Sequence, residues 1–479
     1  MYDFIVVGAG SAGCLVASRL IRFGYTVLLL EAGGPETEIT QDATKSGVLV
    51  SNYFNNYFWT EGNSQDPQSF PFIGGRLEGG GSSVNGMQFV RGTNAFFNDW
   101  SRRVGDERWN AKSAAKAYNF ILKYLSIRSG AANDNAANAF ATAFTAVTGL
   151  PVTPDYNDPA TPFGPNPECQ LFQFSNGTRC SSAQAFLSPI QSQRLTVKLH
   201  ATVVGLDFKG RDCHQIHAIV DGEETCFRAE RVILCSGFNN APLLMRNGFG
   251  PRAELQEFEI PVHTDLPAVG KHLRNQLLLN TVGKGVVPLP TNPDPQAVYS
   301  GMAFSPQILP GKPEKKRRFQ WVGTVGDQNT YGLGVVPLEA QSQGTMRLLS
   351  TDPLQAPKYS FNYLSTDKDI SEIVEAGNLT NQILRAMGLT PTIELWTPEL
   401  VKTMYGQTYH WVGGCSMDTK EHRGVVGTDG RLHGTTNVYI ADASIIPQQI
   451  NDNQPDGNTE GAGALPVGYI IAEQFRRHC

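Results

Sequence analysis

The pattern of hydrophobic and polar positions is clearest near the N-terminus. Phe4 to Val7 is a short apolar run typical of a buried parallel strand, and Thr26 to Leu30 is a second run of this kind. Between them, apolar residues recur at helical spacing from Leu15 to Ile21, and the pattern closes at Gly24. The pattern therefore predicts a strand, a helix and a second, parallel strand.

The later pattern is less regular. Residues of about 265 to 420 predict mixed strands and loops with proline-rich breaks. The 49 glycines and 29 prolines favour many tight turns over a helical bundle. A basic run, GKPEKKRRF at Gly311 to Phe319, predicts a solvated loop.

Composition narrows the class of protein. A chain of 479 residues predicts more than one domain, and its 41% hydrophobic and 17% charged residues are ordinary for a globular protein. The formal charge of −5 gives no reason to expect a nucleic-acid partner. No apolar segment approaches the roughly 18 residues of a membrane span, and the N-terminus lacks signal-peptide features. The eight cysteines form no CxxC pair, so we expect no zinc site, no disulfide framework and a cytoplasmic location.

A glycine motif joins the first predicted strand to the helix, at Gly8 to Gly13. Gly8 permits a tight turn, Gly10 lets the backbone approach a pyrophosphate, and Gly13 lets the helix pack closely on the strand. Glu31 follows the second strand at the spacing of an acid that binds a ribose hydroxyl. The motif predicts a dinucleotide, and Glu31 argues against NADP, but NAD and FAD both stay open.

A second glycine cluster, GGRLEGGGSSVNGMQFVRG, covers Gly74 to Gly92. Three consecutive glycines followed by two serines predict a loop with exposed backbone, which can run against a flat ring system. The apolar residues from Val84 to Val90 argue against a flexible linker.

With these motifs the chain resembles the glucose–methanol–choline (GMC) oxidoreductases. Two further family signatures are SGFNNAPLLMRNGFGP, Ser236 to Pro251, and NVYIADASIIP, Asn437 to Pro447. The four motifs stand in the family order and span nearly the whole chain. The resemblance implies an α/β FAD-binding domain of the Rossmann-like GMC type and an α+β substrate domain with a mostly antiparallel sheet.

The predicted domains are discontinuous. We expect residues 1–150, 190–265 and 425–479 to form the FAD-binding domain. Residues 151–189 and 266–424 are expected to form the substrate-binding domain.

The resemblance also implies a set of FAD contacts. The first glycine motif would hold the pyrophosphate, the second cluster would follow the isoalloxazine and ribityl chain, and Val203 would meet the adenine. Val84 stands where some members carry a histidine bonded to FAD, so we predict noncovalent FAD. The predicted contacts are Gly8, Gly10, Ser11, Ala12, Gly13, Glu31, Ala32, Arg76, Gly80, Ser83, Asn85, Gly86, Met87, Val203, Ser236, Gly237, Asp442 and Ala443.

His410 lies in YGQTYHWVGGCSMDTK, Tyr405 to Lys420. Taken alone, it could be a catalytic base, a metal ligand beside Cys415 or a core histidine. No second His/Cys pair is placed to complete a tetrahedral site, so no metal is predicted. The stretch resembles the family's catalytic-histidine motif, and an imidazole can accept an alcohol proton near neutral pH.

The resemblance places a second catalytic residue, His or Asn, before the last helix. Here the match is ambiguous between Asn458 and Asn453, and Asn458 is favoured. Either could instead be a turn asparagine.

The resemblance thus implies FAD-dependent oxidation of a small-molecule alcohol substrate to an aldehyde or ketone. His410 would take the proton, flavin N5 the hydride, and O2 or another acceptor would reoxidise the flavin. One alternative is a hydroxynitrile lyase, although Trp411 and Val412 lack that group's additional histidine. The other is a non-catalytic FAD-binding protein, against which an intact His410 argues.

Overall fold

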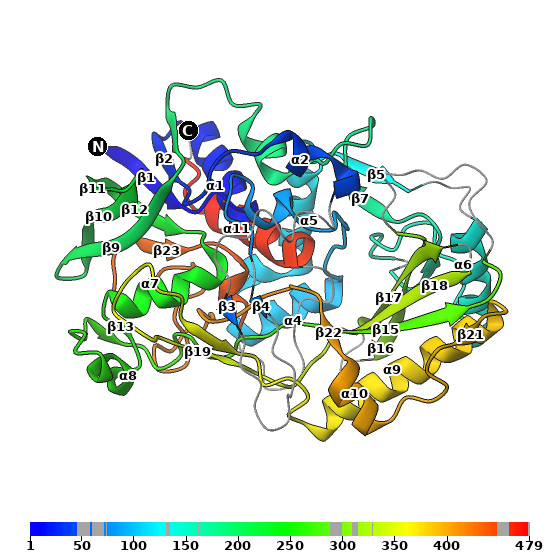
Figure 1. Ribbon diagram of the computed structural model, residues 1–479. Coiled ribbons are helices and arrows are strands. Elements are labelled where there is room, and N and C mark those ends of the chain that lie inside the picture. Colours follow the sequence, from blue (N-terminus) through cyan, green and yellow to red (C-terminus); the bar gives the residue numbers. More distant parts are fainter. Residues whose placement is uncertain are drawn as a thin grey trace.

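The computed structural model describes residues 1–45, 58–59, 71–72, 74–130, 135–160, 162–287, 299–308, 315–327, 329–447 and 459–477. Two large sheets organise this part of the chain, one parallel with five strands and one antiparallel with seven (Figure 1). These are the two kinds of sheet that the sequence predicts. The predicted domain boundaries stay a prediction.

The parallel sheet confirms the strand–helix–strand unit at the N-terminus. The first two strands of the chain lie before and after α1 (Ser11–Arg22) in the sequence. Val7, in the first strand, pairs with Leu30 of the second strand on one side and with Leu234 of a third strand on the other. The carboxyl ends of three central strands therefore meet at one edge, where open α/β sheets bind ligands. In spatial order the strands are β23 (Val438–Ile440), β12 (Ala229–Leu234), β1 (Tyr2–Val7), β2 (Val27–Leu30) and β8 (Leu195–Lys198).

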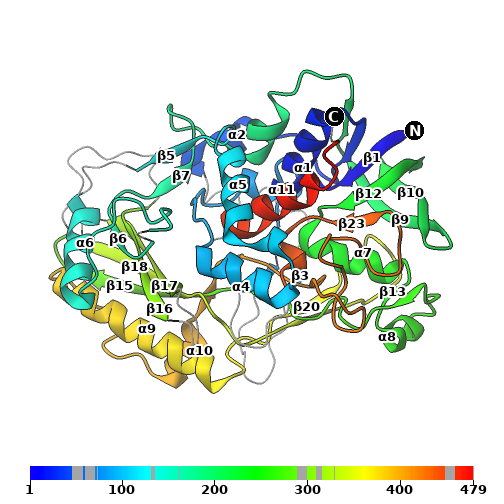
Figure 2. The same ribbon diagram turned by 180° about the vertical axis from the view of Figure 1, so that it is seen from behind.

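Helices cover this sheet (Figure 2). The helix α1 packs on α11 (Leu465–Glu473), to which the ion pair Arg19–Glu473 also ties it. The helix α11 packs on α5 (Ala111–Ile121), which in turn contacts α4 (Asn94–Val104). The last helix of the chain is thus held against the first.

The antiparallel sheet is covered by α9 (Asp367–Ala386) and α6 (Asn135–Thr148), and α10 (Pro398–Met404) packs on α9. The 20-residue helix α9 lies in a region whose sequence predicts only strands and loops, so that prediction is incomplete. In spatial order the strands are β21 (Thr390–Pro391), β15 (Leu277–Lys284), β18 (Thr330–Pro337), β17 (Lys315–Asp327), β16 (Met302–Ile308) and β6 (Gly164–Asn166), with β22 (Gly406–Gln407) also paired to β15.

Smaller elements complete the fold. A three-stranded antiparallel sheet contains β9 (Ala201–Lys209), β10 (Asp212–Val220) and β11 (Glu223–Phe227). The two-stranded pairs are β13 (Phe249–Gly250) with β14 (Thr264–Asp265), β3 (Phe58–Trp59) with β4 (Pro71–Phe72), β5 (Ile127–Ser129) with β7 (Gln170–Phe172), and β19 (Thr345–Arg347) with β20 (Lys358–Ser360). The short helices are α2 (Glu38–Gln41), α7 (Asn240–Arg246) and α8 (Arg252–Glu257).

The structure corrects the prediction made for the basic run. Its described part, from Lys315 onward, is strand β17 rather than a solvated loop. Lys316 is 1% exposed and forms an ion pair with Glu339 at 3.0 Å, and the Arg317 guanidinium lies 4.2 Å from the centre of the Phe304 ring. These charges are buried because each has a partner inside the fold.

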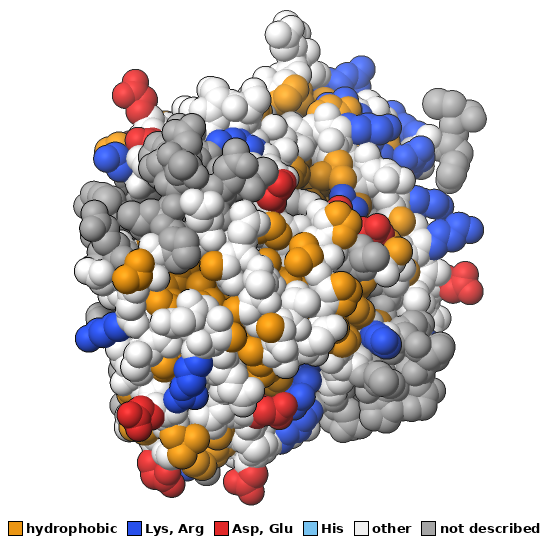
Figure 3. Space-filling view, turned by 90° about the vertical axis from the view of Figure 1, so that its right-hand side faces the viewer, with side chains coloured by type: hydrophobic (Ala, Val, Ile, Leu, Met, Phe, Trp, Pro, Cys, Tyr) orange, Lys and Arg blue, Asp and Glu red, His pale blue; other side chains and the backbone are white. Residues whose placement is uncertain are grey.

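The surface at the end that carries the antiparallel sheet shows both signs of charge. Acidic and basic side chains there surround exposed hydrophobic ones (Figure 3). Among the helices that the structure describes, none combines the length and apolar character needed to cross a membrane.

Candidate active site

A cavity of about 970 Å³ is lined by residues from both large sheets. The first glycine motif, the second glycine cluster and the loop of His410 meet on its wall, although they lie far apart in the sequence. The predicted site residues that line it are Gly8, Gly10, Ser11, Ala12, Glu31, Ala32, Arg76, Gly80, Asn85, Gly86, Met87, Val203, Ser236, Gly237, His410, Asp442 and Ala443.

Two predicted FAD contacts, Gly13 and Ser83, do not belong to this lining. A Cβ atom on Gly13 would lie 1.9 Å from the carbonyl oxygen of Gly8, so Gly13 is required where the helix packs on the strand. Ser83 is fully buried, and its hydroxyl donates to Glu36 Oε1 at 2.7 Å, while its oxygen also lies 2.9 Å from the carbonyl oxygen of Glu78. Both residues therefore support the cavity wall without lining the cavity.

The two glycine clusters meet backbone to backbone. Gly8 has φ = +96°, and a Cβ there would lie 2.8 Å from the carbonyl oxygen of Cys235. A Cβ on Gly80 would lie 2.7 Å from the Cα of Gly10, whereas a Cβ on Gly10 itself would meet no atom within 4 Å. Gly10 therefore presents bare backbone to the cavity at the start of α1, which fits a phosphate group of a dinucleotide.

Glu31 is fixed at the end of β2. Its Oε2 accepts from the N–H of Ala9 at 2.8 Å, and its Oε1 accepts from the N–H of Gly33 at 2.9 Å. Burial raises the pKa of Glu31 above its ordinary value, while the two N–H groups oppose that shift. The carboxylate is thus held at the cavity edge, where it could accept from ribose hydroxyls.

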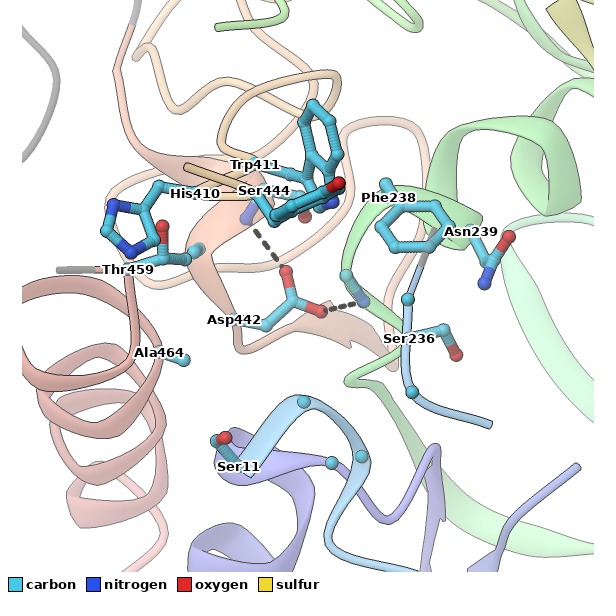
Figure 4. Close-up of a pocket in the computed structure, with 18 of the residues that line it drawn as sticks. Ser11, Ser236, Phe238, Asn239, His410, Trp411, Asp442, Ser444, Thr459 and Ala464 are labelled. Atoms are coloured by element: carbon cyan, nitrogen blue, oxygen red, sulfur yellow. Dashed lines mark hydrogen bonds between the residues drawn. The ribbon is translucent and has the colours of Figure 1, made fainter. Parts of the chain in front are cut away.

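Asp442 ties together two family motifs (Figure 4). Its carboxylate accepts from the N–H of Gly237 at 2.8 Å, from Asn240 Nδ2 at 2.8 Å and from the N–H of Ser444 at 2.9 Å. Burial raises the pKa of Asp442 above its ordinary value, and the hydrogen bonds from these donors oppose that shift. Asp442 thereby positions the backbone of Gly237 and Ala443 on the cavity wall.

The second glycine cluster is held in an unusual conformation. Met87 is buried with φ = +63°, a region in which a non-glycine side chain is strained. The N–H of Met87 donates to Asn85 Oδ1 at 3.0 Å, which stabilises this turn. Val84 lines the cavity and offers no nucleophile, in agreement with noncovalent FAD.

His410 is anchored by two consecutive amide side chains that precede β15. Its backbone N–H donates to Asn275 Oδ1 at 2.8 Å, and its Nδ1 lies 2.6 Å from Gln276 Oε1. Asn275 Nδ2 donates in turn to the Tyr363 hydroxyl at 2.7 Å and to Gln407 Oε1 at 3.1 Å. The sequence motif located His410 but gave no sign of this support.

The environment of His410 keeps its ring neutral. Burial lowers the pKa of His410 from an ordinary 6.5 to about 4. Next to it, the rings of Trp411 and Phe361 are stacked with centroids 4.8 Å apart. Cys415 is fully buried, and the described residues contain no group of His, Cys, Asp or Glu side chains able to hold a metal ion.

The predicted partners of His410, Asn458 and Asn453, lie outside the described residues. Thr459, which directly follows Asn458, lines the cavity and points to the same end of it as His410 (Figure 4). Among the described residues, the Thr459 hydroxyl has no hydrogen-bond partner although its oxygen is buried. Glu460 also lines this cavity.

The chain matches known proteins over its whole length. Family models described as GMC oxidoreductase match residues 2–278 and 340–455. An oxygen-dependent choline dehydrogenase of Pseudomonas savastanoi pv. phaseolicola is 27% identical, over 99% of this chain and 93% of the relative.

Solved structures share the fold. A pyridoxine 4-oxidase from Mesorbium loti has a TM-score of 0.87 at 23% identity, over 100% of this chain and 99% of the other. A fungal aryl-alcohol oxidase has a TM-score of 0.80 at 17% identity, over 99% of both chains. The chain therefore belongs to the GMC oxidoreductase family, and the predicted family, fold class, FAD cofactor and alcohol-oxidoreductase class are confirmed.

Proposed function

We propose that His410 takes the hydroxyl proton when this enzyme oxidises an alcohol to an aldehyde or ketone. The observation that carries this proposal is the hydrogen bond between His410 Nδ1 and Gln276 Oε1 at the wall of the FAD cavity. An amide oxygen only accepts, so Nδ1 bears the hydrogen and Nε2 keeps its lone pair. Nε2 is then the atom that receives the proton.

The chemistry that FAD supplies when bound is acceptance of a hydride from the alcohol carbon. His410 is neutral near pH 7 because its pKa is low, so it is ready to accept the proton that leaves the hydroxyl. Asn275 holds the backbone of His410 in place. Asn458, or alternatively Asn453, would hydrogen-bond the substrate oxygen.

The class implies a small-molecule substrate and an electron acceptor. We infer that the substrate is an alcohol and that O2 or another carrier reoxidises the flavin, without a nucleic-acid partner. Amide side chains on the cavity wall, Gln88, Asn280 and Gln320, could bind polar groups of the alcohol. The described cysteines are free, which supports a reducing compartment such as the cytoplasm.

Anaerobic stopped-flow mixing tests the proposal. The FAD-loaded enzyme is mixed with choline, pyridoxine or benzyl alcohol, and the flavin absorbance is followed. The H410A variant should reduce its flavin about 10²- to 10⁴-fold more slowly, because the general base is lost. The exposed His422 provides the control H422A, which should keep the wild-type rate.

Two outcomes would overturn the proposal. A near-normal rate in H410A would remove His410 from the proton transfer. Cleavage of a cyanohydrin by an enzyme whose flavin no alcohol reduces would instead support the lyase alternative.

A further inference from the structure

A buried carboxylate that the proton transfer does not use lies on the cavity wall. Glu460 is 8% exposed and belongs to a π-helical turn, Thr459–Ala464, that leads into α11. Its Oε1 accepts from the hydroxyls of Ser11 at 3.0 Å and Ser182 at 3.1 Å. Its Oε2 accepts from Asn85 Nδ2 at 2.7 Å. The donors come from three segments far apart in the sequence.

A buried cation balances this carboxylate. Arg179 is 1% exposed, and its Nη1 donates to Asn85 Oδ1 at 2.9 Å. The Asn85 amide therefore lies between the two charges, accepting from Arg179 and donating to Glu460. Burial raises the pKa of Glu460, and the three hydrogen bonds and the Arg179 charge oppose that shift. Buried charges are retained only where such partners compensate for lost hydration.

Glu460 lies next to both segments that would hold the cofactor. Ser11 follows Gly10, whose bare backbone opens on the cavity and touches the second glycine cluster at Gly80. Asn85 belongs to that cluster and lines the cavity with Glu460. The carboxylate thus joins the segment suited to the phosphates to the segment suited to the flavin ring. His410 has its own hydrogen-bond partners and needs none of these residues.

We infer that Glu460 lowers the redox potential of the bound FAD by placing a negative charge beside the cofactor. Reduction adds electron density to the cofactor, and a nearby carboxylate in a water-poor site disfavours that state. Arg179, on the other side of Asn85, acts in the opposite direction. The inference needs FAD binding, which the family provides, and does not depend on which residue takes the substrate proton.

The test is a reductive titration of the FAD-loaded enzyme against reference dyes, without substrate. E460Q keeps the shape of the side chain and removes its charge. At a fixed potential, the ratio of reduced to oxidised flavin should rise about tenfold or more, and tenfold corresponds to about 30 mV for a two-electron couple. An unchanged ratio would overturn the inference.

The matched control is E36Q. Glu36 is also partly buried and accepts from Ser83 Oγ at 2.7 Å and Gln184 Nε2 at 3.0 Å, but it does not line the cavity. This variant should leave the ratio within about twofold of the wild type, since its charge is not beside the cofactor. An equal shift in E36Q would show a general charge effect and refute a specific role of Glu460.

The sign of the effect gives a second criterion. R179Q removes the positive charge and should lower the ratio, opposite to E460Q, while R179K should stay near the wild-type ratio. Shifts of the same sign in E460Q and R179Q would indicate a structural disturbance and overturn the inference. If E460Q does not retain FAD, the R179Q and R179K pair decides by the same sign criterion. The titration contains no substrate, so its outcome is independent of the test of the proton transfer.

Discussion

The five-stranded parallel sheet and the seven-stranded antiparallel sheet both line the cavity, and they bury different side chains. In the parallel sheet, Phe4–Val7 and Val27–Leu30 are buried and entirely apolar. In the antiparallel sheet, β17 buries Lys316, Arg317 and Gln320. The strand ends of the parallel sheet (the parallel wall) present bare backbone to the cavity at Gly8 and Gly10, with the Glu31 carboxylate beside them, whereas the antiparallel sheet (the antiparallel wall) presents side chains such as Asn280 and Gln320. A backbone site can be encoded in one short motif, but a side-chain site needs residues from several distant segments.

The largest expected effect concerns the buried charges of the antiparallel sheet. Lys316 and Glu339 are each 1% exposed and lie 3.0 Å apart. K316M would leave the Glu339 carboxylate buried and unpaired, which should lower the free energy of unfolding by about 3–5 kcal/mol. Chemical denaturation followed by tryptophan fluorescence measures this loss.

The double variant K316M/E339L is the control. Replacing both charges with apolar side chains should recover most of the lost stability, because no unpaired charge remains. A double variant as unstable as K316M would mean that the loss of stability does not come from an unpaired charge. The contrast between an apolar parallel sheet and an antiparallel sheet with paired buried charges would then not hold.

The next effect concerns glycines of the parallel wall. In G13A, the new Cβ would lie 1.9 Å from the carbonyl oxygen of Gly8, so the backbone must shift at a cost of about 1–3 kcal/mol. G10A meets no protein atom within 4 Å and should leave the stability of the apoprotein unchanged. Both should weaken FAD binding, G13A by distorting the site and G10A by filling it. Thermal melts of the apoprotein and FAD titrations separate the two, and a destabilised G10A apoprotein would contradict this assignment.

The contrast between a local backbone motif and side chains from distant segments explains which parts of the site the sequence predicts. The glycine motif and Glu31 were predictable because their geometry is local, and the structure places Gly8, Gly10 and Glu31 on the cavity. His410 was predictable only through a family motif. Its support from Gln276 was not, because the two residues come together through a bridge between residues 274 and 412 that no periodicity reveals.

Buried charged side chains were the features that the sequence predicted least well. The basic run, Gly311 to Phe319, has the composition of a solvated loop, and only partners that are distant in the sequence, such as Glu339 for Lys316, allow Lys316 and Arg317 to be buried in β17. Glu460 directly follows Asn458 and Thr459, which the sequence marks as a catalytic region, yet nothing local distinguishes it from a surface carboxylate. Its three donors lie between 278 and 449 residues away in the sequence.

The smallest expected effect is a displaced pH profile, and it concerns Gln276, which directly precedes β15 of the antiparallel sheet. In Q276E, a carboxylate would replace the amide oxygen that lies 2.6 Å from His410 Nδ1. It should raise the pKa of His410 above its present value of about 4, because an opposite charge at this distance stabilises the imidazolium. Since the neutral ring accepts the proton, the acid limb of flavin reduction should move to higher pH by about one to three units.

Two variants sharpen this prediction. Q276L removes the acceptor without adding charge, so it should slow flavin reduction about tenfold, roughly the value of one hydrogen bond, and leave the acid limb in place. Gln343 Oε1 lies 2.7 Å from His272 Nδ1, a pair of the same chemistry that does not line the cavity. Q343E should therefore raise the pKa of His272 and leave the rate profile unchanged. If Q343E moved the acid limb as far as Q276E does, the limb would report overall charge, and the side chain at position 276 would not set the protonation of His410.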